Sequence, residues 1–140
     1  MGEVMTQSYT GGCACGAIRF ELEQEPIGMG NCHCRDCQRA TGGPYFPSVV
    51  SKVADFKLLQ GTPSWFEKYS DDGERVGRSF CPDCGSPLMF VNAVKDDLYA
   101  IYASAFDDPS FYKSESDIYI DSAQPWDHIA PDAKTYPRSS

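Results

Sequence analysis

The sequence has no long apolar run: nowhere do 18 consecutive apolar residues occur, which is the length that a membrane-spanning helix requires. Residues 1–10 also lack the basic region followed by an apolar stretch that marks a secretory leader. Basic side chains are the minority, with 12 lysines and arginines against 20 aspartates and glutamates and a net charge of -8. Because phosphate backbones attract cationic surfaces, nucleic acid is not an expected partner. We therefore expect a cytoplasmic protein that neither crosses a membrane nor binds nucleic acid.

The chain is short and carries no linker, internal repeat or low-complexity segment. Its 140 residues are 41% hydrophobic and 13% aromatic, which is enough apolar material for a single modest core. We expect one domain over residues 1–140.

The seven cysteines are the most informative residues, because an odd number cannot be paired completely as disulfides. Without export the compartment is reducing, and there clustered cysteines act as metal ligands or catalysts more often than as disulfides. Their spacing divides them into two pairs and one group of three. The pairs are Cys13-x-Cys15 and Cys81-x-x-Cys84, and the group is Cys32, Cys34 and Cys37. The division of four plus three matches one closed and one open metal site.

The two cysteine pairs predict a structural zinc site with four thiolate ligands, which is the closed pattern of tetrahedral zinc. Residues i and i+2 of an extended chain face the same side, so Cys13 and Cys15 can present both sulfurs to one metal. In the second pair Gly85 follows Cys84 directly. This order is typical of a zinc knuckle, in which backbone N–H groups point at the sulfurs and the glycine takes a positive φ. The simpler alternative, four small buried apolar residues, does not account for these spacings beside glycines.

The group of three, Cys32, Cys34 and Cys37, predicts a catalytic zinc, because three protein ligands leave a fourth position for water or substrate. A competing interpretation is a redox centre, since Cys34-x-x-Cys37 is also a thiol–disulfide spacing. Such a centre usually accompanies a βαβ pattern, which is absent from this sequence. His33 lies between two ligands, so we predict a structural or supporting role for it rather than ligation. His128 is a weaker candidate still for a fourth ligand.

Two arginines near the open site are candidates for substrate binding. Arg35 and Arg39 are four residues apart and share one face if this segment is helical. They would then bind a carboxylate of a thiol substrate beside the metal, although arginines flanking a loop are more often simply solvated. No general acid or base can be identified, because Tyr45, His33 and Asp36 are only close in sequence.

Short strands separated by turns dominate the rest of the pattern. Ile18, Phe20 and Leu22 alternate with polar residues, as in a half-buried strand. Further strands are predicted at 45–50, 56–60, 65–69, 74–80, 86–91 and 98–103, with an edge strand at 118–120 and no regular structure over 122–140. The Asp72-Gly73 pair predicts a hairpin turn, and a short helical turn follows Cys37. This composition of elements indicates an all-β sandwich or open barrel.

Three motifs together resemble a known family. They are Gly12-Cys13-x-Cys15-Gly16-x-Ile18-Arg19-Phe20, then Cys32-His33-Cys34-x-x-Cys37-Gln38-Arg39-x-x-Gly42-x-Pro44, then Phe80-Cys81-x-x-Cys84-Gly85-Ser86-x-Leu88. The chain resembles the glutathione-dependent formaldehyde-activating enzymes, a family that includes centromere protein V, over about residues 10–128. The resemblance implies an Mss4-like, zinc-stabilised all-β fold with one zinc on Cys13, Cys15, Cys81 and Cys84. It also implies a second zinc on Cys32, Cys34 and Cys37, which need not be fully occupied.

The resemblance further implies an activity. The founding enzymes join glutathione and formaldehyde into S-hydroxymethylglutathione and are carbon–sulfur lyases in the reverse direction, so we expect a lyase that acts on a small thiol and an aldehyde. Three other functions remain open: a non-catalytic zinc-binding or thiol-carrier module, a protein-interaction module, and a methionine-R-sulfoxide reductase. The last shares the architecture, but the sequence has no cysteine after Cys84 to act as its nucleophile.

Overall fold

A computed structural model describes residues 9–139. The expected absence of a secretory leader concerns residues 1–10, and residues 1–8 lie outside the described residues. The strands are β1 (Tyr9–Gly12), β2 (Arg19–Leu22), β3 (Gly28–Cys32), β4 (Phe46–Lys52), β5 (Phe56–Gln60), β6 (Ser64–Tyr69), β7 (Arg75–Phe80), β8 (Pro87–Asn92), β9 (Leu98–Tyr102) and β10 (Asp117–Ile118). The α-helix is α1 (Arg35–Thr41), and the 3-10 helices are η1 (Val53–Asp55), η2 (Ala93–Lys95), η3 (Ala103–Ala105), η4 (Pro109–Phe111) and η5 (Ile120–Ser122).

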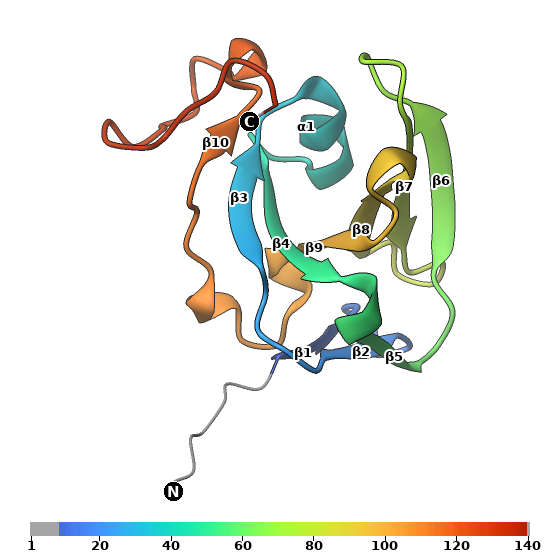
Figure 1. Cartoon of the computed structure of the whole chain (residues 1–140). Helices are drawn as coiled ribbons and strands as arrows, with labels where there is room; N and C mark the ends of the chain where they lie inside the picture. The colour runs from blue at the N-terminus through green and yellow to red at the C-terminus, as the bar shows by residue number, and fades with distance from the viewer. Residues whose placement is uncertain (1–8, 140) are drawn as a thin grey trace, which may run out of the picture.

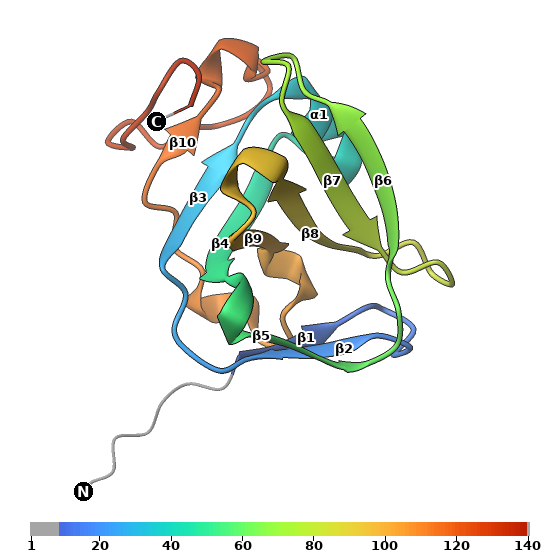
Figure 2. The ribbon, with the colours of Figure 1, turned by 45° about the vertical axis from the view of Figure 1, so that its right-hand side comes forward.

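The strands form two sheets. A seven-stranded sheet has the order β10-β3-β4-β9-β8-β7-β6, and a three-stranded sheet has the order β1-β2-β5. Only β10 and β3 pair in parallel among these strands. The large sheet curves so that the small sheet lies across one end of the molecule, while α1 lies at the opposite end (Figures 1 and 2). The predicted all-β, Mss4-like class is confirmed. No helix within residues 9–139 combines the length and apolar character needed to cross a bilayer.

The core lies between the two sheets and is centred on aromatic contacts. Phe20 of β2 stacks on Phe56 of β5 with ring centroids 5.2 Å apart, and it meets Phe106 edge-on at 5.3 Å. Phe20 is 1% exposed, and burial of one such side chain contributes about 1.5–3 kcal/mol. Gly11 lets the small sheet approach this closely, since an added Cβ would lie 2.3 Å from the carbonyl oxygen of Ala105.

Most of the predicted strands are present. Ile18, Phe20 and Leu22 are buried as the alternation predicts, and β5 covers the predicted residues 56–60. The hairpin between β6 and β7 turns at Gly73, whose φ is +82°. The predicted edge strand at 118–120 occurs at 117–118 instead, because Tyr119 takes a left-handed φ of 58° and ends the strand.

Two strands and most of the helix were not predicted. β1 and β3 are rich in glycine, and glycine disfavours strands unless neighbouring strands supply the hydrogen bonds. β3 receives these bonds from β4 on one side and β10 on the other. The predicted short helical turn after Cys37 is instead α1, which begins at Arg35 because the Cys34 side chain caps it, and which ends where Gly42 takes φ +76°. Residues 122–140 were predicted to have no regular structure. Residues 123–139 have none apart from a single β-bridge at Thr135, and residue 122 ends η5.

Candidate metal centres

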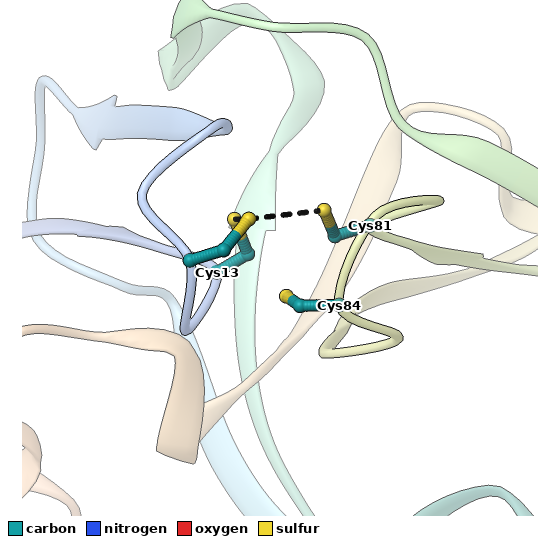
Figure 3. A group of neighbouring side chains, drawn as sticks. Cys13, Cys81 and Cys84 are labelled. Atoms are coloured by element: carbon teal, nitrogen blue, oxygen red, sulfur yellow. Dashed lines mark hydrogen bonds between the residues drawn. The ribbon is translucent and has the colours of Figure 1, made fainter.

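The four-cysteine cluster joins the two sheets. Cys13 and Cys15 lie in the turn between β1 and β2, and Cys81 and Cys84 lie in the turn between β7 and β8. Their sulfurs all lie within 4.8 Å of one another, with Cys13 Sγ 3.6 Å from Cys15 Sγ and Cys15 Sγ 3.8 Å from Cys81 Sγ. Figure 3 shows the side chains converging from the two turns. Segments 66 residues apart in sequence therefore present their sulfurs to one point.

Local backbone geometry holds these sulfurs in place. The amide of Ile18 donates to Cys13 Sγ at 3.2 Å, and the amide of Asp83 donates to Cys81 Sγ at 3.4 Å. Gly85 takes φ +79° and its amide donates to the carbonyl of Cys81 at 2.8 Å. The predicted knuckle geometry is confirmed. Hydrogen bonds of this kind stabilise thiolates rather than thiols.

The electrostatics of the second turn also favour a thiolate. A hydrogen bond with the Ser86 hydroxyl, 3.2 Å from Cys84 Sγ, lowers the pKa of Cys84 to about 6. The same hydroxyl accepts a hydrogen bond at 3.0 Å from the amide of Ala14 in the other turn. Ser86 therefore connects the two cysteine pairs directly.

The spacing of the four sulfurs fits a tetrahedral metal. Four sulfurs at the usual zinc–sulfur distance of about 2.3 Å lie about 3.8 Å from one another. The measured separations of 3.6 and 3.8 Å agree with this value. The donor set of soft thiolates matches zinc in a closed structural site.

The three-cysteine cluster gathers around the start of α1. Cys32 ends β3, Cys34 caps α1, and Cys37 lies in its first turn. The three sulfurs lie within 4.8 Å of one another, and the amide of Cys37 donates to Cys34 Sγ at 3.3 Å. Cys37 is buried, whereas Cys32 and Cys34 are partly accessible. The hydrogen bond with Cys32 lowers the pKa of Cys34, while hydrogen bonding to Cys34 raises the pKa of Cys32.

A cation that the sequence did not single out completes this cluster. Arg78 of β7 places Nη2 3.7 Å from Cys37 Sγ, and its guanidinium lies 5.0 Å from the ring centroid of Phe90. Its charge adds to the lowering of the Cys34 pKa. Arg78 gave no local signal, because it is one polar residue in an alternating strand and its partner is 41 residues away.

The two arginines predicted to bind substrate make no hydrogen bond to the cluster, unlike Arg78. Arg35 and Arg39 are both on α1 as expected, and both are exposed. Arg35 donates to the side-chain oxygen of Gln38, and neither arginine makes a hydrogen bond to a cluster sulfur within the described residues. Asp36 Oδ1 lies 2.9 Å from Lys68 Nζ, so this carboxylate is held in an ion pair rather than free to act as an acid or base at the cluster.

His33 faces away from the three sulfurs, as its place between two ligands predicts. Its Nε2 lies 2.8 Å from Asp117 Oδ1, and its Nδ1 lies 3.0 Å from Asp127 Oδ2. All three side chains are less than a tenth exposed. His33 also lines a cavity of about 450 Å³ whose wall includes Lys113. The ring therefore fixes the segment that carries Cys32 and Cys34 against the C-terminal segment.

Replacing His33 with leucine should lower the free energy of unfolding by about 3–5 kcal/mol, since the buried Asp127 loses its ion-pair partner and Asp117 keeps only the side-chain amide of Asn31, 3.0 Å away, as a side-chain donor. Urea unfolding followed by fluorescence would measure the loss.

His128 is exposed and belongs to neither sulfur cluster, so it is not the fourth ligand of the three-cysteine site in this structure. The control His128→Leu should change stability by no more than about 0.5 kcal/mol. Equal stability of both variants would show that His33 is not structural.

These observations define an all-β protein with one closed and one open cysteine cluster. A model of the family described as glutathione-dependent formaldehyde-activating enzyme matches residues 8–122. The chain belongs to this family.

Individual relatives agree with this assignment. A protein of Halomonas elongata, provisionally named a glutathione-dependent formaldehyde-activating enzyme, is 31% identical over 101 residues, which are 69% of this chain. The match spans 64% of that relative's length. A crystal structure of a Rhodobacter sphaeroides protein superposes with a TM-score of 0.58 and 14% identity, over 91% of this chain and 98% of the other. That similarity concerns the fold alone.

Proposed function

We propose that the protein is a zinc-dependent enzyme that adds a small thiol to an aldehyde, with glutathione and formaldehyde as substrates, and that cleaves the carbon–sulfur bond in reverse. The observation that carries the proposal is the cluster of three sulfurs, from Cys32, Cys34 and Cys37, with an arginine beside it. Family membership supports the choice of substrates.

In this proposal the two clusters have different roles. Cys13, Cys15, Cys81 and Cys84 hold a structural zinc, and Cys32, Cys34 and Cys37 hold a zinc that, when bound, lowers the pKa of a substrate thiol. We further propose that the chain acts as a single domain. The open cluster has the ligand number of catalytic zinc sites, whereas the closed one leaves no position for a substrate.

The protein's own residues would position the reactants. The amide of Cys37 and the guanidinium of Arg78 contact the sulfurs and favour their anionic form. The substrate thiolate forms a bond to the aldehyde carbon while the carbonyl electron pair moves to oxygen, and the resulting alkoxide takes a proton from solvent. In reverse, the hydroxyl loses its proton and the carbon–sulfur bond breaks with its electron pair on sulfur.

The remainder of a glutathione molecule would meet charged groups of both signs. The exposed guanidinium groups of Arg35 and Arg39 on α1 would bind a distant carboxylate. The cavity beside His33 carries Lys113 and Lys134 together with four carboxylates, those of Glu115, Asp117, Asp127 and Asp132, so its mostly acidic wall would bind the ammonium end of a γ-glutamyl group. Binding energy from such distant groups would position the thiol at the cluster.

The test is the rate at which ¹³C-formaldehyde exchanges between its free form and its glutathione adduct, measured by NMR exchange spectroscopy with the zinc-loaded protein. The expected result is an exchange rate that rises in proportion to protein concentration and returns to the uncatalysed value after chelation. S-methylglutathione, which has no thiol, is the matched control and should give no S-hydroxymethyl adduct. Thiol binding without faster exchange would make the protein a thiol carrier and overturn the enzymatic function.

A further inference from the structure

Arg78 is a partly buried cation that no carboxylate neutralises within residues 9–139. The ion pairs among these residues involve other basic side chains, and Arg78 Nη2 donates to Cys37 Sγ at 3.7 Å. Its Nε is fully buried and has no hydrogen-bond partner. Most buried N–H groups are paired, so an unpaired guanidinium nitrogen beside a sulfur cluster indicates a missing acceptor.

Tyr102 is a second buried donor without a partner. It ends β9, is 1% exposed, and its hydroxyl makes no hydrogen bond among the described residues. The ring is held by Phe46, with centroids 4.1 Å apart. Burial raises the pKa of Tyr102 to about 12, and the charge of Arg78 opposes this rise. The hydroxyl therefore keeps its proton at neutral pH and remains a donor.

Both donors belong to the surroundings of the same cluster. Phe46, which lies opposite Cys32 in the β3–β4 pair, packs on the Tyr102 ring at 4.1 Å and lies 6.3 Å from the Phe90 ring, over which the Arg78 guanidinium is placed. Arg78 and Tyr102 come from β7 and β9, on either side of β8 in the large sheet. Two strands of one sheet thus carry two unused donors that pack around the Phe46 and Phe90 rings, and one of the two contacts the cluster directly, while the two arginines on α1 are exposed.

We propose that Arg78 and Tyr102 together bind the oxygen atom of the aldehyde and of the alkoxide that forms from it. This inference rests on the proposed function. When the carbon–sulfur bond forms, the carbonyl electron pair becomes a full negative charge on that oxygen, and preorganised donors stabilise such a charge most strongly. The proton that completes the hydroxyl comes from solvent, so both side chains keep their own protons throughout.

The overall charge of the centre agrees with this role. Three thiolates and one divalent cation carry a formal charge of -1, and Arg78 brings the sum to zero. The alkoxide would then form beside a neutral centre rather than beside an anionic one, where it would be repelled.

The first test uses stability, which needs no metal in the open site. Tyr102→Phe removes only a hydroxyl that has no partner, so the thermal unfolding midpoint should stay unchanged or rise. The exchange rate of the formaldehyde adduct should nevertheless fall about 10- to 100-fold. Tyr99→Phe, on the same strand β9, is the matched control and should leave the exchange rate unchanged. A lower midpoint for Tyr102→Phe would show a structural hydroxyl and overturn the inference.

The second test measures binding without turnover. In the cobalt-loaded protein, mercaptoacetate carries an anionic oxygen near its sulfur and ethanethiol does not, so the wild type should prefer mercaptoacetate by about tenfold. Titration of the thiolate-to-cobalt absorption gives both affinities. Arg78→Met and Tyr102→Phe should each reduce this preference, whereas Arg75→Met, an exposed arginine on the same strand, should preserve it.

The outcomes separate this inference from the proposed function. A wild-type preference that both variants reduce, without any acceleration of adduct exchange, would support the oxygen-binding pair and overturn the enzymatic function. Acceleration that survives in both variants would support the function and overturn the pair. Equal affinities of the wild type for the two thiols would also overturn the pair.

Discussion

Replacing Cys84 with alanine should yield unfolded or aggregated protein. The residue is one of four cysteines, proposed as zinc ligands, that connect the small sheet to the turn between β7 and β8, and its sulfur lies within 4.8 Å of the other three. Structural zinc contributes on the order of 10–16 kcal/mol of apparent binding free energy, against a total stability of about 5–15 kcal/mol for a domain. The loss of such an ion would therefore cost an amount comparable to the whole stability of the fold.

Soluble yield, circular dichroism and zinc content would measure the effect. Ser86→Ala is the matched control, because it removes the hydroxyl beside Cys84 but leaves all four ligands. It should cost about 1 kcal/mol and preserve zinc binding. A soluble Cys84→Ala protein with the wild-type melting temperature would mean that the closed cluster is not a structural metal site.

Replacing Cys34 with serine should abolish thiol binding and catalysis while the fold survives. Cys34 is one of the three cysteines proposed to hold a zinc in the open cluster, so its replacement should release that metal. It is also the N-cap of α1, where its side chain accepts a hydrogen bond from the amide of Cys37. Serine is among the best N-cap residues, so α1 should remain intact and the free energy of unfolding should change by no more than about 1 kcal/mol.

Three measurements check this prediction together: zinc stoichiometry, the cobalt spectrum with added thiol, and the exchange rate of the formaldehyde adduct. The expected stoichiometry falls from two zinc ions per chain to one, with no spectral response to thiol. If the Cys34→Ser protein bound thiols and accelerated exchange as the wild type does, Cys32 to Cys37 would be a second structural clip. A protein that unfolded would also contradict the separation of roles between the two clusters.

The sequence predicted the cysteine grouping because ligand spacing is a local property. Cys81-x-x-Cys84-Gly85 already contains the turn that places amides against sulfurs, and the structure has that turn. Alternation likewise predicted which face of the Ile18–Leu22 segment is buried. β3 was missed because Gly28 and Gly30 give no strand signal of their own, and its two neighbouring strands come later in the chain.

Contacts between distant segments account for most of what the sequence left open at the sites. Asp117 meets His33 across 84 residues, and Arg78 meets Cys37 across 41, so neither pair has a recognisable spacing. The prediction that Arg35 and Arg39 share a helix was correct in structure, since both lie on α1. A shared helix does not determine how far the two guanidinium groups lie from a bound substrate, so the role of Arg35 and Arg39 in binding stays a prediction.

The two clusters also differ in what must happen before they can form. Cys32, Cys34 and Cys37 span six residues, so a nascent chain can bring their sulfurs together at little cost in loop-closure entropy. The closed cluster must instead bring Cys15 to Cys81, 66 residues away, which requires β7 to be in place beside the small sheet. The order of assembly follows from this difference. The open cluster could therefore bind a metal ion early in folding, whereas the closed cluster could bind one only after the strands have reached their final arrangement.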